Sequence, residues 1–454
     1  MSTFRRIQST VACVALCGVI AGCREQPTAP GLPSESLRPM AAREGPLVLG
    51  GTILTPGGVL KHGYVAVVRG RIASVSVKAP ELDDALLIDT DGIILPGFVD
   101  VHNHVPWNVL PRWRPGRTFA NRDEWREDPG YVQKARDPFE RLSAAHFCDM
   151  NAWGELRALV GGTTSIMATQ PDACIHGLVR NLDLNSGFYG TSELDREHII
   201  NVLGVPPATD LPGREQFVAA AGFFIANPLY EALVIHVAEG IDALSEEEFT
   251  FLQSGSLLNP KGVVIHGISL TPSDFAAMAA AGTALVWSPR SNLELYGTTT
   301  DVAAALNAGV EVALAPDWAI TGSGNMLDEL KVADGWSRQH LGGRLSARQL
   351  VAMVTSVPAH VAGAEDEVGA ITPGLRADLL IIDGEGNDPY RDVVNAAAER
   401  IQLVLIDGVP LYGSRSPMQR LWQGSELEAV TVGSSSKLVA PAAGVRVAEL
   451  AGRL

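Results

Sequence analysis

The chain has 454 residues, a formal net charge of −16 and 46% hydrophobic residues. These values are typical of a globular protein with one large domain and a smaller one. The acidic balance argues against a nucleic-acid partner and against electrostatic adhesion to an anionic membrane surface.

The N-terminus predicts a lipoprotein signal peptide over residues 1–22. Arg5 and Arg6 precede an apolar run over residues 11–22, which is too short to cross a bilayer as a mature helix. The run ends in Ile-Ala-Gly before Cys23, and this resembles the bacterial lipobox. The resemblance implies lipidation of Cys23 and export to the cell envelope, in the outer membrane or periplasm. A plain signal peptide is the alternative.

A tether and a pair of cysteines complete the picture of an exported chain. Residues 23–45 are rich in Pro, Ser and Glu, which predicts a flexible tether, so we expect membrane contact through the lipid anchor alone. Cys148 and Cys174 remain in the folded part. We expect two buried free thiols, with oxidation in an exported chain as the alternative. No CxxC pair is present, which excludes a cysteine-type zinc site.

Short β-rich runs with Gly turns flank a different central pattern. Residues 46–95 and 366–415 predict antiparallel strands that together build a small composite β-sandwich. Residues 96–365 alternate apolar runs with helical stretches, which predicts an α/β fold, a (β/α)8 TIM-like barrel of the usual size of about 250 residues. An open α/β sheet would give a similar alternation, but no GxGxxG turn follows the first strand. Residues 416–454 stay unassigned.

Histidines and carboxylates stand at the ends of the predicted barrel strands. His102 and His104 lie two residues apart, so both project to the same side of a strand. At the carboxyl end of a barrel strand, such a pair faces the active site and suits zinc or iron. The pair alone is a weak signal. It gains support because later strand ends carry His236 with Glu239, His266 and Asp317.

These motifs resemble the amidohydrolase superfamily, and within it the branch of cytosine deaminase, guanine deaminase and the s-triazine hydrolases. The resemblance covers residues 47–413. The motifs that carry it are, in chain order, ILPGFVDVHNH, GGTTSIMAT, HVAEG, IHG, SPRSNLELYG, AGVEVALAPDW and GLRADLLIIDG. It implies a barrel hydrolase that uses a metal ion.

The matched positions imply roles for particular residues. Four would hold the metal, namely His102, His104, His236 and Asp317. Asp317 would also take a proton from the attacking water, and Glu239 would carry a proton to the leaving nitrogen. His266 would orient the water or polarise the substrate.

We expect one divalent metal ion. Two-metal members of the superfamily use a carboxylated Lys on the fourth strand, and the runs TTSIMAT and HIINVLGV, taken as strands three and four, contain no Lys. Zinc is the preferred identity and iron the alternative. Pro316 departs from the Gly-Thr-Asp of the family before Asp317, so we expect a locally irregular strand end.

Candidate substrate-binding residues lie in loops at the same end of the barrel. Trp107 and Arg112 belong to an aromatic and basic stretch, which fits either a grip on a planar or anionic substrate or a lid packed on itself. Arg180 is a further candidate, with a surface salt bridge as its alternative. Asn292, beside Ser291, matches a family loop after the seventh strand.

The expected reaction is hydrolysis of a non-peptide carbon–nitrogen bond in a small molecule, by deamination or by opening of a cyclic amide. One alternative is a hydrolase of esters, lactones or peptide-like amides on the same site. Another is a surface lipoprotein that binds ligands without turnover, against which Glu239 and Asp317 argue, since a binding module needs no proton shuttle. A homo-oligomer is compatible with the sequence, and the fold alone does not name a substrate.

Overall fold

The computed structural model describes residues 45–454 apart from several internal stretches. Those left out are 168–173, 175–177, 183–198, 203, 229, 385–386, 423–426 and 441–444. The predicted signal peptide, Cys23 and the predicted tether up to residue 44 lie outside the described residues, so lipidation stays a prediction. Among the described helices, none is long and apolar enough to cross a membrane.

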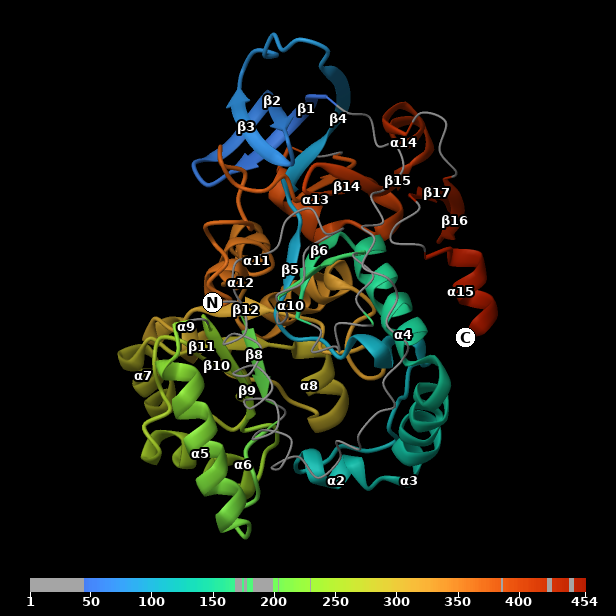
Figure 1. The fold of residues 1–454 in the computed structure, drawn as a ribbon. Helices are drawn as coiled ribbons and strands as arrows, with labels where there is room; N and C mark the ends of the chain where they lie inside the picture. The colour runs from blue at the N-terminus through green and yellow to red at the C-terminus, as the bar shows by residue number, and fades with distance from the viewer. Residues whose placement is uncertain are drawn as a thin grey trace, which may run out of the picture.

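A nine-stranded sheet draws its strands from both ends of the chain (Figure 1). The N-terminal strands are β1 (Leu47–Thr55), β2 (Gly58–Val68), β3 (Arg71–Ser76) and β4 (Leu86–Pro96). The C-terminal strands are β13 (Leu379–Ile382), β14 (Ile401–Ile406), β15 (Val409–Ser414), β16 (Glu428–Val432) and β17 (Ser435–Val439). The two sets join where β4 pairs antiparallel with β13, which places Leu95 opposite Leu380. The tail that the sequence left unassigned therefore supplies the edge strand β16 and its neighbour β17.

The central part of the chain forms the parallel strands of a barrel. These are β5 (Phe98–Asp100), β6 (Thr163–Ile166), β7 (Arg180–Asn181), β8 (Ile199–Val202), β9 (Ala232–Val237), β10 (Gly262–His266), β11 (Ala284–Trp287) and β12 (Val312–Leu314). They pair in the orders β5-β6-β7 and β12-β11-β10-β9-β8, and a bridge between Asn103 and Asp317 joins the two groups. The predicted fold class, an α/β barrel with a β domain from both flanks, is confirmed.

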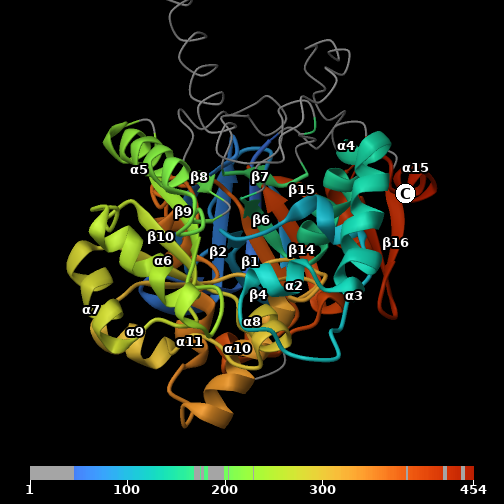
Figure 2. The same ribbon diagram turned by 90° about the horizontal axis from the view of Figure 1, so that it is seen from below.

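Helices cover the outside of the barrel, so the strands are buried on both faces. Every residue of β9 and β10 is buried, which explains why these strands are unbroken apolar runs up to a terminal polar residue. The longer helices are α4 (Asp137–Val160), α5 (Leu211–Ala226), α6 (Ala243–Ser254), α7 (Pro272–Ala281) and α10 (Met326–His340). Seen from below, α5, α6 and α7 lie on one side of the strands and α4 on the other (Figure 2).

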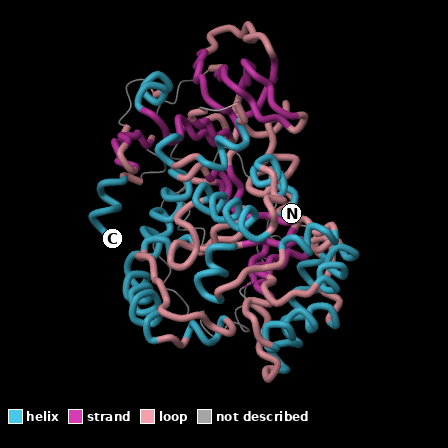
Figure 3. The backbone as a smooth tube through the Cα atoms, turned by 180° about the vertical axis from the view of Figure 1, so that it is seen from behind, coloured by secondary structure: helices cyan, strands magenta, loops and turns pink. Residues whose placement is uncertain are grey.

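Short helices fill the connections. After β5 come η1 (Val105–Val109), α2 (Arg122–Arg126), α3 (Pro129–Tyr131) and η2 (Val132–Arg136). Later ones are α8 (Pro289–Tyr296), α9 (Val302–Ala308), α11 (Ala347–Ala352), α12 (Ser356–Val361), α13 (Pro389–Asn395), η4 (Ala398–Arg400), α14 (Arg415–Leu421) and α15 (Val447–Arg453). Viewed from behind, the strand-rich domain stands at one end of the barrel (Figure 3). Because β4 runs almost directly into β5, that end is where the barrel strands begin, and the strand ends that carry polar residues lie opposite.

The numbering of the barrel strands differs from the sequence prediction. The run TTSIMAT contains β6, which is the second barrel strand, and the third is the two-residue β7. Two residues are too few to produce an apolar run, so the periodicity gave no signal for β7. Neither β7 nor β8 contains Lys, so the basis for expecting one metal ion is unchanged.

Arg180, on β7, links the barrel to the sheet domain. Its guanidinium is buried and forms ion pairs with Asp378 (3.1 Å) and Asp407 (2.9 Å), which flank β13 and β14. A buried guanidinium is tolerated because it is paired with carboxylates that it also hydrogen-bonds. Arg180 therefore stabilises the interface between the barrel and the sheet domain. This corrects its assignment as a substrate-binding residue and also the surface salt bridge that was the alternative.

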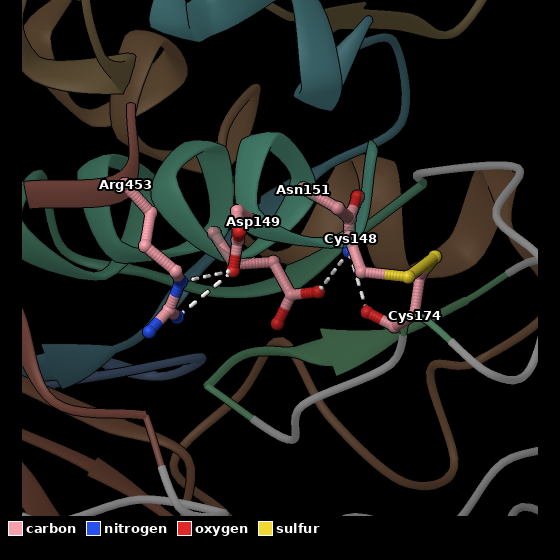
Figure 4. The surroundings of a disulfide bond; sticks show 6 residues. Cys148, Asp149, Asn151, Cys174 and Arg453 are labelled. Atoms are coloured by element: carbon pink, nitrogen blue, oxygen red, sulfur yellow. Dashed lines mark hydrogen bonds and ion pairs between the residues drawn. A yellow bond between two sulfur atoms is a disulfide. The ribbon is translucent and has the colours of Figure 1, made fainter. Parts of the chain in front are cut away.

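A disulfide bond joins Cys148 on α4 to Cys174 (Figure 4). The expectation of free thiols is wrong, and the oxidised alternative holds. Nearby, Asn151 donates to the Cys174 carbonyl at 3.1 Å, and Arg453 of α15 pairs with Asp149 at 2.8 Å. The middle of α4 thus holds both the segment after β6 and the C-terminal helix.

Removal of this disulfide is expected to lower the free energy of unfolding. The two cysteines are 26 residues apart, and a cross-link over a loop of that order stabilises by about 3 kcal/mol, mainly by restricting the unfolded chain. Cys148→Ser should unfold at a lower denaturant concentration than the oxidised protein in equilibrium denaturation. As the control, the Cys148→Ser/Cys174→Ser double variant should ignore added reductant. Equal stability of the oxidised and reduced wild-type protein would contradict this account.

Candidate metal centre

Four predicted ligands meet at the carboxyl ends of three barrel strands. His102 and His104 directly follow β5, His236 lies on β9 next to its last residue, and Asp317 follows β12. The backbone ties two of these ends together, because the Asp317 N–H donates to the His102 carbonyl and the His104 N–H to the Asp317 carbonyl. Strands distant in sequence therefore deliver their polar ends to one point, as in other barrel enzymes.

The side chains converge closely enough to share one cation. Asp317 Oδ1 lies 3.3 Å from His102 Nε2 and 3.4 Å from His104 Nε2. The His236 ring centroid is 5.0 Å from that of His102 and 5.6 Å from that of His104. Two triads have ligand atoms within 4.8 Å of one another, namely His102, His104 and His236, and His102, His266 and Asp317.

Unpaired buried nitrogens indicate that these residues fit a metal ion. Neither His102 Nε2 nor His236 Nδ1 has a hydrogen-bond partner, although both atoms are buried. Buried polar atoms without partners are costly and need an explanation. A divalent cation at this point would take both lone pairs. Imidazole nitrogen with one carboxylate is a donor set that suits zinc.

The environment keeps the imidazoles in the form that binds metals. Burial and the neighbouring histidines lower the pKa of His102 and His236 well below the ordinary value, and burial lowers that of His104 to about 4. These side chains are therefore neutral at pH 7. Burial raises the pKa of Asp317 well above its ordinary value, which a neighbouring cation would offset by favouring the carboxylate.

Ser288 orients the ring of His102 through a hydrogen bond. Ser288 directly follows β11, and its hydroxyl lies 2.9 Å from His102 Nδ1. Both side chains are fully buried. When Nδ1 carries the proton and donates to Ser288, Nε2 keeps its lone pair toward Asp317. Such partners orient the ligands of metal sites and tune their basicity.

Asn292 is fully buried and orients His266. Its Oδ1 lies 2.8 Å from His266 Nδ1, while its Nδ2 donates to the hydroxyls of Thr299 and Thr300. The amide oxygen thus accepts from His266, so Nδ1 carries the proton of the neutral ring. His266 then presents a lone pair at Nε2, which accepts a hydrogen bond. This favours orienting a water over donating to the substrate, and it corrects the substrate-binding assignment of Asn292.

Glu239 is a buried carboxylate beside this cluster, with Oε1 at 3.8 Å from His266 Nε2. The Tyr296 hydroxyl donates to Oε1 at 2.8 Å, and Trp125 Nε1 donates to that hydroxyl at 2.8 Å. Burial raises the pKa of Glu239, but the neighbouring His266, the guanidinium groups of Arg122 and Arg126 and the Tyr296 hydrogen bond together outweigh burial and lower it below the ordinary value. Glu239 is therefore ionised and ready to accept a proton.

Four residues of the site were missed by the sequence analysis. They are Ser288 and Tyr296, Trp125, and the buried Arg122, which donates to the His236 carbonyl at 3.3 Å and pairs with Glu248. Ser288 is the first and Tyr296 the next-to-last residue of the motif SPRSNLELYG, and the other two lie in the long stretch after the first strand. The sequence signal that could have identified these residues was their position in a family motif or in a loop at the active-site end of the barrel.

The backbone at Asp317 is irregular, as the Pro316 departure predicts. β12 ends at Leu314, and Asp317 has a φ of +67°. His266 and Ala238 also have positive φ, at +68° and +55°. Residues other than Gly adopt this region at a cost of about 1–3 kcal/mol, and such strain is found at functional sites.

An aromatic wall adjoins the metal centre. The Trp318 ring contacts His104 at a centroid distance of 5.5 Å and Trp107 at 5.6 Å. Trp107 in turn stacks on Phe139 at 3.7 Å, so one of its faces is covered. Arg112 donates to the carbonyls of residues 321 and 322 and to Glu294. These contacts favour the alternative in which Arg112 packs the loop on itself over a role in binding substrate. Trp107 is separated from the predicted metal ligand His104 only by the ring of Trp318.

Loss of His236 should empty the centre. His236→Ala removes one ligand and leaves three, so we expect metal far below one equivalent per chain after purification, measured by plasma mass spectrometry. His360→Ala is the matched control, because His360 is an exposed histidine whose contacts are carboxylates at the surface. A full equivalent of metal in His236→Ala would remove His236 from the ligand set.

Residues 230–411 match the model of the amidohydrolase family, a stretch that contains His236, Glu239, His266 and Asp317. A 5-methylthioadenosine/S-adenosylhomocysteine deaminase of Symbiobacterium thermophilum is 27% identical over 420 residues, covering 81% of this chain and 93% of that protein. A 5'-deoxyadenosine deaminase of Methanothermobacter thermautotrophicus is 25% identical, covering 80% and 92%.

Solved structures share the fold. A mutant atrazine chlorohydrolase from Arthrobacter aurescens TC1, complexed with zinc and atraton, matches with a TM-score of 0.65 at 19% identity, covering 80% of this chain and 95% of that one. E. coli guanine deaminase matches with a TM-score of 0.63 at 19% identity, covering 81% and 99%. The chain therefore carries an amidohydrolase-family match over residues 230–411 and is similar to hydrolases of carbon–nitrogen bonds other than peptide bonds.

Proposed function

We propose that the chain is a deaminase that uses one divalent metal ion, preferably zinc, to release ammonia from an aminated heterocycle of the purine type. The observation that carries the proposal is the placement of two buried carboxylates against the histidine cluster, Asp317 beside His102 and His104 and Glu239 beside His266. One is positioned to take a proton from water and the other to deliver a proton to nitrogen.

The reaction adds water to the ring carbon that bears the amino group and expels ammonia, which leaves an oxo group. The metal, held by His102, His104, His236 and Asp317, would supply water with a pKa lowered toward neutrality. Asp317 accepts the proton of the attacking water. The Nε2 lone pair of His266 accepts a hydrogen bond from that water and orients it. Glu239 carries a proton to the departing nitrogen.

The substrate class follows from the relatives and from the wall of the site. The relatives above are named as deaminases of methylthioadenosine, S-adenosylhomocysteine and deoxyadenosine, and the E. coli structure is a guanine deaminase. Trp318 and Trp107 lie beside His104, where flat side chains suit a planar ring. Opening of a cyclic amide, or hydrolysis of an ester or lactone, would use the same site without the release of free ammonia from an exocyclic amine.

Glu239→Gln tests the proposed reaction. Ammonia release is measured for the metal-loaded protein with 5'-methylthioadenosine, S-adenosylhomocysteine, 5'-deoxyadenosine and guanine. Loss of the proton carrier should lower kcat by about 10²–10⁴-fold with metal content unchanged. Glu246→Gln, an exposed glutamate of α6, is the matched control and should behave as wild type. Turnover of esters or lactones, with no ammonia from any amine, would replace the deaminase with the alternative hydrolase.

We also propose that the chain is exported and held at the membrane by lipid on Cys23. Two separate observations support this, namely the lipobox-like sequence before Cys23 and the Cys148–Cys174 disulfide, since structural disulfides are typical of oxidising compartments. In a Gram-negative host, Cys23→Ala should move the protein from the membrane fraction to the soluble fraction. Ser34→Ala is the control. Equal membrane recovery of Cys23→Ala and the wild type would exclude the anchor.

A further inference from the structure

A short chain of hydrogen bonds connects α2, in the stretch after β5, to Glu239, the carboxylate that carries the proton. Trp125 Nε1 and the Tyr296 hydroxyl are 2.8 Å apart, as are that hydroxyl and Glu239 Oε1. All three side chains are buried. Trp125 belongs to α2 and Tyr296 is the last residue of α8, so two loops of the barrel meet at Glu239.

The direction of both hydrogen bonds is determined by chemistry. An indole nitrogen has a hydrogen and no available lone pair, so Trp125 donates and Tyr296 accepts. The hydroxyl hydrogen of Tyr296 is then directed to the remaining partner, Glu239 Oε1. Oε1 is therefore engaged as an acceptor. Among the described residues, no side chain donates to the other oxygen, Oε2.

The segment that leads into α2, and so carries Trp125, is held in place by other contacts. Asn121 forms a β-bridge with Gly240, the residue after Glu239. The Ile241 N–H donates to the Ala120 carbonyl at 2.7 Å, and Asn121 Nδ2 donates to Asp242 at 2.6 Å. The segment before α2 thus pairs with residues 240–242, directly after Glu239, so the indole is positioned relative to the carboxylate.

We propose that Trp125 and Tyr296 are positioning residues that reserve Oε1 of Glu239 as a hydrogen-bond acceptor, so that Glu239 receives and delivers its proton on Oε2. The proposal rests on the deaminase function for the meaning of the delivery step, but the arrangement of the carboxylate is independent of any substrate. A carboxyl with one occupied oxygen protonates on the free one, which gives the proton a single direction of transfer. Tyr296 favours the ionised form, so its removal makes Glu239 hold its proton more tightly.

The first test is an infrared titration of the metal-loaded protein without substrate. The carboxyl band of Glu239 is identified by its loss in Glu239→Gln. In Tyr296→Phe, the midpoint of that band should move upward by about one pH unit, because the carboxylate loses a hydrogen-bond donor. Trp125→Phe should move it in the same direction by less, since Tyr296 keeps its hydroxyl. If Tyr296→Phe fails to fold, Trp125→Phe carries the test.

Tyr131→Phe is the matched control. Tyr131 is a buried tyrosine whose ring lies 4.9 Å from that of Trp125, yet its hydroxyl bonds neither Glu239 nor Tyr296. It should leave the midpoint in place. An unchanged midpoint in both Tyr296→Phe and Trp125→Phe, or an equal shift in Tyr131→Phe, would overturn the proposal.

Kinetics separate this proposal from the proposed function. On whichever amine the wild type deaminates, Tyr296→Phe should lower kcat by about 10–100-fold with KM within about twofold, and the acid limb of the pH profile should move upward. A raised KM with kcat unchanged would assign Tyr296 to substrate binding and overturn the proposal. If no amine is deaminated while the infrared midpoint still shifts, the deaminase function fails and the positioning role stands.

Discussion

A carboxylate and three neutral imidazoles meet at one point, with three of the four side chains buried, and much of the barrel is arranged around this constraint. His102 is 0% exposed and Asp317 4% exposed, yet nitrogens of His102 and His236 have no protein partner. An arrangement of this kind is stable where a cation completes it. The strands β5, β9 and β12 bring the ligands together. Behind them, Ser288 orients the ring of His102, and Asn292 determines the tautomer of His266.

The two ends of the barrel have different tasks. The carboxyl ends of the strands carry the chemistry, and the beginning of the barrel is joined to the nine-stranded sheet. Arg180 shows the difference, since its charge is neutralised by Asp378 and Asp407 of the sheet domain. Arg180, which the sequence suggested as a pocket residue, therefore belongs to the interface between the barrel and the sheet domain. The barrel that carries the metal centre is thus joined to the sheet domain at its opposite end.

What the sequence predicts well is local or periodic. The i, i+2 spacing of His102 and His104 and the strand-end positions of the other ligands follow from strand geometry, so the cluster could be proposed before the structure. The remainder depends on contacts between distant residues. Asp378 is 198 positions from Arg180, Tyr296 is 171 positions from Trp125, and β7 has two residues. The pairing of Cys148 with Cys174 and the tautomer of His266 likewise follow from three-dimensional neighbours.

The left-handed backbone at Ala238, His266 and Asp317 has a consequence for how the protein can evolve. Three residues other than glycine hold an unfavourable conformation at strand ends that carry the site, so part of the barrel rim is locally under tension, whereas the same conformation in the sheet domain, as at His62 and Asp91, lies away from the ligands. Substitutions that relax the rim would gain stability and lose the alignment of the ligands. Stability is therefore more safely increased far from the rim, and the nine-stranded sheet is where such changes would be tolerated.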